Sequence, residues 1–249
     1  MDALRTNRIG ITFGGVTALS GVTLSLRVGE RHCIIGPNGA GKTTLFNLIT
    51  GVLRPTIGQV FLFDKDITNY PTHLRPSMGL ARTFQITNLF PNLSVMENIY
   101  LGIQARRWTK YVFYRRTTEF RDIIDSAGSL LQEWGLWKKR NYPVSSLSHG
   151  EQRQLEIILA MSSQPKVLLL DEPTQGLSIA DTRLVVPLVE SMDRSTSILF
   201  IEHDMDVAFK LADRITVLHY GVIIAEGTEA EIRGNSKVAE VYLGVETHA

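Results

Sequence analysis

Residues 36–44 combine glycines, a lysine and two threonines in the order of a phosphate-binding loop. They fit the P-loop pattern of one glycine, any four residues, Gly-Lys and then Ser or Thr. Glycines let backbone N–H groups turn inward around phosphate oxygens, and the helix that follows adds its positive N-terminus. We expect Lys42 to reach the β- and γ-phosphates and the Thr43 hydroxyl to bind Mg²⁺. The predicted nucleotide-binding residues here are Gly36, Pro37, Asn38, Gly39, Ala40, Gly41, Lys42, Thr43 and Thr44.

Two carboxylates at the end of an apolar run supply the acidic partner that a P-loop needs. The run covers residues 167–170, and Asp171 and Glu172 follow it directly. In an open α/β sheet, ligands bind at the carboxyl ends of the strands. We predict that Asp171 holds Mg²⁺ through water and that Glu172 polarises a water for attack on the γ-phosphate. The alternative is that both acids only cap a strand end before Pro173.

Apolar strands that alternate with helices position these residues and predict an α/β fold with a mostly parallel sheet. A strand at 31–35 leads into the glycine loop, and a helix at 42–50 leaves it and ends at Gly51. The other expected strands are 9–13, 22–28, 58–63, 80–84, 166–170 and 197–201, with a hairpin of 214–219 and 222–226. The other expected helices are 180–192 and 205–211, with a helical tail.

The stretch from 87 to 164 has a different character, because its apolar residues recur at helical spacing and β-branched runs are scarce. We predict a helical subdomain inserted into one domain of 249 residues. The α/β core is then formed by 1–86 and 165–249.

The composition excludes several classes of protein. The chain has 249 residues, 44% of them hydrophobic, which is enough for a sizeable core. One cysteine cannot form an internal disulfide, and a net charge of +1 removes the global basic bias of many nucleic-acid binders. No apolar run approaches the roughly 18–20 residues that span a bilayer, and the first residues do not resemble a signal peptide. These features predict a cytoplasmic chain.

The segment 147–152, Leu-Ser-His-Gly-Glu-Gln, resembles the signature motif of the ABC ATPases, which is usually Leu-Ser-Gly-Gly-Gln. It precedes an apolar helix and lies about 20 residues before Asp171, as in that family. Gln85 at a strand end and His203 after another strand follow the family's order. The resemblance implies a P-loop NTPase fold of the ABC nucleotide-binding type. Such a domain has a mostly parallel sheet core, an antiparallel β-subdomain and an inserted helical subdomain.

The resemblance also implies how the site is completed. In this family two ATP-binding domains form a head-to-tail dimer, and each ATP and its Mg²⁺ lie between the P-loop of one and the signature of the other. The implied signature residues are Ser148, His149, Gly150 and Glu151, with Ser148 and Gly150 on the γ-phosphate in trans. Gln85 would meet the metal and the attacking water.

Two further residues receive roles from the same resemblance. His203 would contact the γ-phosphate and help to hold the catalytic geometry. The alternative is that this histidine is only a residue at the start of a helix. Phe13 would stack on adenine, although an aromatic near a strand end is often part of the core.

Three positions depart from the family pattern. His149 replaces a glycine, Glu151 replaces a glutamine, and Ser178 stands where many relatives have aspartate. Residues 148–151 also form a Ser-x-x-Glu capping box, in which Glu and Gln are interchangeable, so the helix start is expected to survive. The added negative charge of Glu151 would lie near a bound phosphate.

Several strings resemble the branch of ATPases that serves importers of branched-chain amino acids and of urea or amides. They are 13–15 (Phe-Gly-Gly), 81–85 (Ala-Arg-Thr-Phe-Gln), 201–205 (Ile-Glu-His-Asp-Met) and 241–244 (Val-Tyr-Leu-Gly). This resemblance implies a peripheral subunit on the cytoplasmic face of the inner or plasma membrane. Its partners would be transmembrane permease subunits, a second ATPase subunit and an extracytoplasmic solute-binding protein. The alternatives are a lipid or polysaccharide exporter ATPase and a soluble ATPase acting on nucleic acid or ribosomes.

A basic stretch interleaved with aromatic residues occupies 106–121. Anionic lipid headgroups and nucleic acid both fit that composition. A solvated helix face with buried aromatics is the favoured interpretation.

Overall fold

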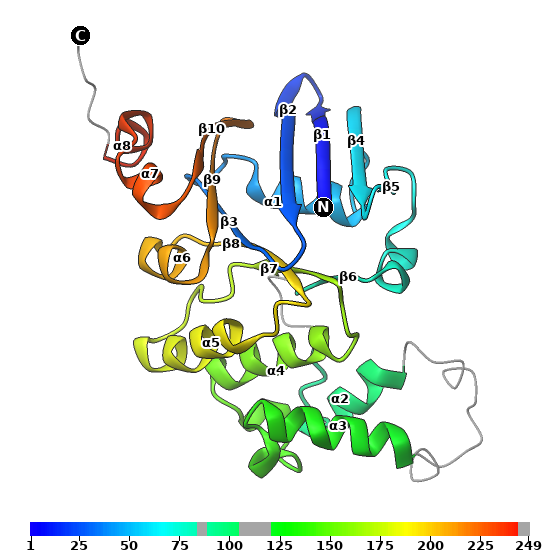
Figure 1. Ribbon diagram of the computed structural model, residues 1–249. Helices are drawn as coiled ribbons and strands as arrows, with labels where there is room; N and C mark the ends of the chain where they lie inside the picture. Colours follow the sequence, from blue (N-terminus) through cyan, green and yellow to red (C-terminus); the bar gives the residue numbers. More distant parts are fainter. Residues whose placement is uncertain (84–88, 105–120, 244–249) are drawn as a thin grey trace. The chain divides into compact units, whose positions relative to one another are not determined.

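The computed structural model describes residues 1–83, 89–104 and 121–243, and the chain divides into two compact units (Figure 1). The first unit comprises Met1–Arg82, Lys166–Gln175 and Met192–Ala249. The second comprises Thr83–Pro165 and Gly176–Ser191.

A six-stranded sheet forms the centre of the first unit, in the order β10-β9-β3-β8-β7-β6. Its pairs are parallel from β9 to β6, and only β10 runs antiparallel to its neighbour. Every residue of β3, β7 and β8 is buried, which explains their continuous apolar runs. The strands are β3 (Arg31–Ile35), β6 (Leu80–Arg82), β7 (Val167–Asp171), β8 (Ser197–Ile201), β9 (Arg214–His219) and β10 (Val222–Gly227).

A second, antiparallel sheet of four strands has the order β2-β1-β4-β5 (Figure 1). Its strands are β1 (Asp2–Phe13), β2 (Val16–Arg27), β4 (Ile57–Leu62) and β5 (Lys65–Asp66). The first two are much longer than the predicted 9–13 and 22–28. Bulges interrupt their register and break the strict alternation of apolar and polar residues, so the pattern hides their full length. The expected α/β fold with an antiparallel β-subdomain is confirmed.

Four α-helices complete the described part of the first unit: α1 (Lys42–Thr50), α6 (Met205–Leu211), α7 (Glu229–Arg233) and α8 (Ser236–Leu243). Helix α1 is flanked by its capping residues Gly41 and Gly51, both in the left-handed conformation that glycine adopts without strain. Short 3₁₀ turns at Thr72–Leu74 and Pro76–Met78 lead into β6.

The described part of the second unit is helical. It contains α2 (Val95–Gln104), α3 (Arg121–Glu133), α4 (His149–Met161) and α5 (Ile179–Ser191), with 3₁₀ turns at Trp137–Lys139 and Val144–Ser146. Helices α2, α3 and α4 enclose an apolar core of their own that includes Ile99, Ile123 and Leu155. The sequence pattern predicts α5 as part of the α/β core, whereas the structure groups it with the helical unit because it packs along α4.

Within the described residues, no helix combines the length and the apolar character needed to cross a membrane.

Candidate nucleotide-binding site

The glycine-rich loop connects the buried strand β3 to helix α1, as a phosphate-binding loop requires. Gly39 and Gly41 have φ values of 79° and 104°, which strongly favour glycine. A Cβ on Gly41 would lie 2.8 Å from Leu19 Cδ2 and 2.9 Å from Ala18 O, so a side chain there would also clash. The loop therefore owes its shape to these glycines.

Lys42, the first residue of α1, turns its ammonium back over the loop. Its Nζ donates to the carbonyl oxygens of Gly36 at 2.6 Å and Pro37 at 3.0 Å. Burial lowers the pKa of Lys42, whereas the carboxylates of Glu172 and Asp171 raise it. The loop lysine therefore lies close enough to the two acids at the end of β7 to feel their charge.

The two predicted carboxylates have different surroundings. The Asp171 side chain is almost fully buried, and its Oδ2 lies 2.6 Å from Nη2 of Arg82. Glu172 has a φ of 48°, which is uncommon for a residue with a side chain, and its N–H donates to Ile201 O at 3.1 Å. Such a strained position at the end of a strand is frequent at functional sites.

His203 meets Glu172 directly. Its Nε2 lies 2.6 Å from Glu172 Oε1, although 31 residues separate the two in the chain. The helix that follows, α6, is capped by Asp204, whose side chain accepts from the N–H groups of Asp206 and Val207. His203 is therefore not the cap of that helix, and its ring is oriented toward the carboxylate.

Glu202 is a buried residue of this site that sequence reasoning missed. Its Oε1 accepts from the Thr174 N–H at 3.1 Å and from the Thr174 hydroxyl at 2.8 Å, and its Oε2 accepts from the His203 N–H at 3.1 Å. Burial raises the pKa of Glu202, against the effect of these hydrogen bonds. The sequence feature that could have identified Glu202 is its position directly after a second apolar strand, whose carboxyl end lies at the same edge of the sheet.

Phe13 ends β1, and its side chain is 47% exposed, so it is not a core residue. An exposed aromatic ring is available for stacking, and its contact with adenine stays a prediction. Gln85 lies outside the described residues, as do residues 106–120 of the basic stretch.

The signature residues lie in the second unit at the start of α4. Ser148 caps the helix: its hydroxyl accepts from the Glu151 N–H at 3.2 Å, and Glu151 Oε2 accepts from the Ser148 N–H at 3.1 Å. This is the expected capping box. Lys139 Nζ lies 2.5 Å from Glu151 Oε1, so the charge that distinguishes Glu151 from glutamine has a local counter-ion.

Asp181, on α5, joins the signature to the loop that contains Ser178. Its Oδ1 lies 3.2 Å from the Ser148 hydroxyl, and its Oδ2 lies 2.7 Å from the Ser178 hydroxyl. A Cβ at Gly150 would lie 2.4 Å from Asp181 Oδ1, so glycine is needed for this approach. The hydrogen bond from Ser178 is the main reason why the pKa of Asp181 is lowered. Asp181 is not among the residues predicted from the sequence.

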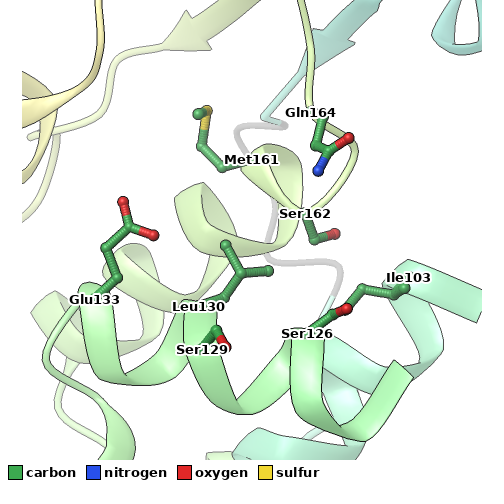
Figure 2. Close-up of a pocket in the computed structure, with 8 residues that line it drawn as sticks. All are labelled: Ile103, Ser126, Ser129, Leu130, Glu133, Met161, Ser162 and Gln164. Atoms are coloured by element: carbon green, nitrogen blue, oxygen red, sulfur yellow. The ribbon is translucent and has the colours of Figure 1, made fainter. Parts of the chain in front are cut away.

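A cavity of about 540 Å³ lies in the second unit, between α3 and the end of α4 (Figure 2). It is lined by Ser126, Ser129 and Glu133 of α3, by Met161 at the end of α4 and by Ser162, which follows that helix. It contains none of the predicted nucleotide-binding residues.

The donor set suits a small hard cation that is bound together with a triphosphate. Mg²⁺ prefers oxygen ligands and is commonly held by one or two carboxylates plus the phosphates of its substrate. Asp171 and the hydroxyl of Thr43 supply that chemistry, with Thr43 in the first turn of α1. Among the residues described, no three His, Cys, Asp or Glu side chains gather into a metal cage of their own.

These features together define a P-loop nucleotide-binding protein with an added helical unit. The family model described as ABC transporter matches residues 19–175, and the chain belongs to this family as an ATP-binding subunit. A second model, described as branched-chain amino acid ATP-binding cassette transporter, matches residues 222–248.

Curated relatives match the chain over nearly its full length. The high-affinity branched-chain amino acid transport ATP-binding protein LivG of Escherichia coli K12 is 38% identical, covering 97% of each chain. The protein BraF of Pseudomonas aeruginosa, described in the same words, is 34% identical over 97% of each chain. A probable LivG of Archaeoglobus fulgidus is 35% identical, covering 99% of this chain and 97% of its own.

Solved structures agree with this assignment. An ATP-binding cassette of an ABC transporter in its ADP conformation superposes with a TM-score of 0.87 at 32% identity, covering 98% of this chain and 100% of its own. A dimeric ATP-binding cassette in a post-hydrolysis state, bound to ADP and Pi, reaches a TM-score of 0.74 at 25% identity. It covers 90% of this chain and 98% of its own.

Proposed function

We propose that this protein hydrolyses ATP to power the import of branched-chain amino acids through separate membrane subunits. The observation that carries the catalytic part is the short contact between Glu172 and His203, 2.6 Å, beside a P-loop lysine. A carboxylate held by an imidazole next to a phosphate-binding loop is suited to position an attacking water.

Each side chain of the site then has a defined task. Lys42 stabilises the negative charge on the β- and γ-phosphates, and the loop N–H groups hold the phosphate oxygens. Glu172 orients the attacking water and accepts its proton, while His203 fixes the carboxylate and contacts the γ-phosphate. Thr43 and Asp171 would hold Mg²⁺, which would neutralise phosphate charge.

The second unit acts on the nucleotide of a partner subunit. We infer a head-to-tail dimer in which Ser148, His149, Gly150 and Glu151 face the triphosphate of the other copy or of a related subunit. The dimer with ADP and Pi among the solved relatives supports this arrangement. The start of α4 is open to a partner, since Ser148 and His149 are exposed.

The solute class follows from the relatives rather than from the site. LivG and BraF are named for branched-chain amino acid transport, and the model that matches residues 222–248 carries the same description. The complete system would contain transmembrane permease subunits and an extracytoplasmic solute-binding protein, with this chain on the cytoplasmic face of the membrane.

An uptake experiment tests the proposal as a whole. A strain lacking this chain is complemented with the wild type, Lys42→Ala or Glu172→Gln, and uptake of labelled leucine, isoleucine and valine is measured, with lysine as the control solute. We expect the wild type alone to restore uptake of the three branched amino acids. Restored uptake with either variant would contradict the catalytic assignment, and unchanged uptake without the chain would contradict the solute assignment.

A further inference from the structure

Arg82 forms a buried ion pair with the predicted metal-binding carboxylate. Its Nη2 lies 2.6 Å from Asp171 Oδ2, and the two side chains are only 7% and 1% exposed. Arg82 ends β6 and Asp171 ends β7, and these strands are parallel neighbours with Arg82 opposite Leu169. The sheet register therefore brings the guanidinium to the carboxylate.

The same guanidinium reaches the helix that leaves the P-loop. Arg82 Nη1 donates to Asn47 Oδ1 at 2.7 Å and lies 3.4 Å from the Thr50 hydroxyl, and its Cζ stands 5.6 Å from the centre of the Phe46 ring. A planar guanidinium with several N–H donors can serve both partners at once, which a lysine ammonium does less well. One side chain thus connects Asp171 to α1.

A cation already paired with Asp171 has a consequence for any metal that arrives with the nucleotide. Mg²⁺ and the guanidinium carry charges of the same sign, and in a buried site their repulsion is weakly screened. We propose that Arg82 is a built-in competitor of Mg²⁺ for Asp171, a counter-cation that stabilises the carboxylate before the metal binds and weakens the metal's hold afterwards. This inference rests on the proposed role of Asp171 in the ATP site.

Two possible roles of Arg82 predict opposite effects of its removal on metal binding. If Arg82 only positioned Asp171 for the metal, its removal would weaken metal binding. If Arg82 competes, its removal leaves more negative potential at Asp171 and strengthens metal binding. The effect of Mg²⁺ on nucleotide affinity separates the two, because the two bound species are thermodynamically linked.

The experiment measures the affinity for the fluorescent nucleotide mant-ADP in Mg²⁺ and in EDTA, and takes the ratio of the two dissociation constants. For Arg82→Met we expect Mg²⁺ to strengthen mant-ADP binding on the order of tenfold more than in the wild type. The control Arg194→Met removes the same charge from an exposed pair with Asp213 and should leave the ratio unchanged. In the double variant Arg82→Met/Asp171→Asn the gain should disappear.

A smaller or equal Mg²⁺ effect in Arg82→Met, or a gain that persists in the double variant, would overturn the inference. If Arg82→Met does not fold, Arg82→Gln decides, because it removes the charge but keeps amide N–H donors for Asp171 and Asn47. We expect a gain of several-fold for this variant as well, and no gain counts against competition. The proposed ATP site fails separately, if the wild type does not bind mant-ADP or if Lys42→Ala binds it equally well.

Discussion

Glu172 is the proposed catalytic base, and its substitution should separate ATP binding from ATP hydrolysis. Replacing Glu172 with Gln keeps the shape of the side chain and removes its basicity. We predict that Glu172→Gln binds ATP with wild-type affinity and hydrolyses it at least about 100-fold more slowly, since a positioned base contributes roughly that factor. Hydrolysis is measured as phosphate release at saturating ATP, and undiminished turnover would remove Glu172 from the mechanism.

His32 gives the fold a pH dependence that is independent of catalysis. It is buried on β3, with Nδ1 3.1 Å from Ser25 O and Nε2 2.7 Å from the Thr216 hydroxyl. Burial, aided by Arg214, lowers its pKa from 6.5 to about 4, although Glu226 and Glu30 act in the other direction. The unfolded chain therefore binds a proton between pH 6.5 and 4 that the folded chain does not.

The stabilising contribution of neutral His32 is complete above pH 6.5 and is lost as the pH falls toward 4. The predicted loss is about 3 kcal/mol of unfolding free energy. Urea unfolding of the wild type and of His32→Gln across this range checks it. The variant should show a flatter pH profile, and parallel profiles would show that His32 is not the responsible group.

Which residues can be identified from sequence depends on how local their signal is. The P-loop and the two acids after 167–170 are contiguous patterns, and the structure brings them together. Glu202 and Asp181 were missed because their partners lie 28 and 33 residues away, at Thr174 and Ser148. Such contacts depend on which strands and helices become neighbours in the fold. The periodicity of the sequence does not predict them.

Helix α1 is held at its C-terminal end by a single buried arginine. Arg75 is only 2% exposed and donates to the carbonyls of Leu48 (3.2 Å) and Ile49 on α1, and of Ile67 (2.9 Å) and Tyr70 (3.1 Å). A cation at this end also complements the helix dipole. Burial lowers the pKa of Arg75 to about 10, which leaves it charged at neutral pH.

We predict that Arg75→Met lowers the unfolding free energy by about 3–5 kcal/mol, because the substitution strands several buried carbonyls at once. Urea denaturation provides the measurement. Arg194→Met serves as the matched control, since its ion pair is exposed and should contribute less than about 1 kcal/mol. Equal losses of unfolding free energy in the two variants would show that Arg75 does not stabilise α1 in this way.

Two substitutions at the start of α4 should affect stability to different degrees. Ser148→Ala should cost about 1 kcal/mol of stability through the lost cap. Glu151→Gln restores the residue usual in the family, keeps the capping box and loses only the partly exposed pair with Lys139, so its stability should change by less than about 0.5 kcal/mol. Thermal unfolding of both variants checks this order, and a larger loss for Glu151→Gln would reverse it.

Element types were predictable wherever one pattern dominates. The buried strands β3 and β8 match their predicted bounds, and α1 and α6 do as well. The boundaries of β1 and β2 were not predictable, because hairpin pairing extends them through polar residues. The grouping of α5 with the helical unit was not predictable for a different reason. It depends on packing against α4, which the sequence of α5 alone does not indicate.

In the proposed head-to-tail dimer, one chain contributes to two different nucleotide sites. The first unit holds the P-loop, Asp171, Glu172 and His203, whereas the second holds the signature at the start of α4. In the proposed dimer each nucleotide would therefore be enclosed only when two subunits meet.

Sedimentation of Glu172→Gln with ATP and Mg²⁺ tests this central claim most directly. The variant should bind ATP without consuming it, so the nucleotide remains as the bridge between P-loop and signature. We predict a stable dimer with ATP and a monomer with ADP, and a monomer with ATP when Ser148→Arg is added to obstruct the signature. A Glu172→Gln chain that binds ATP and stays monomeric would contradict the shared site.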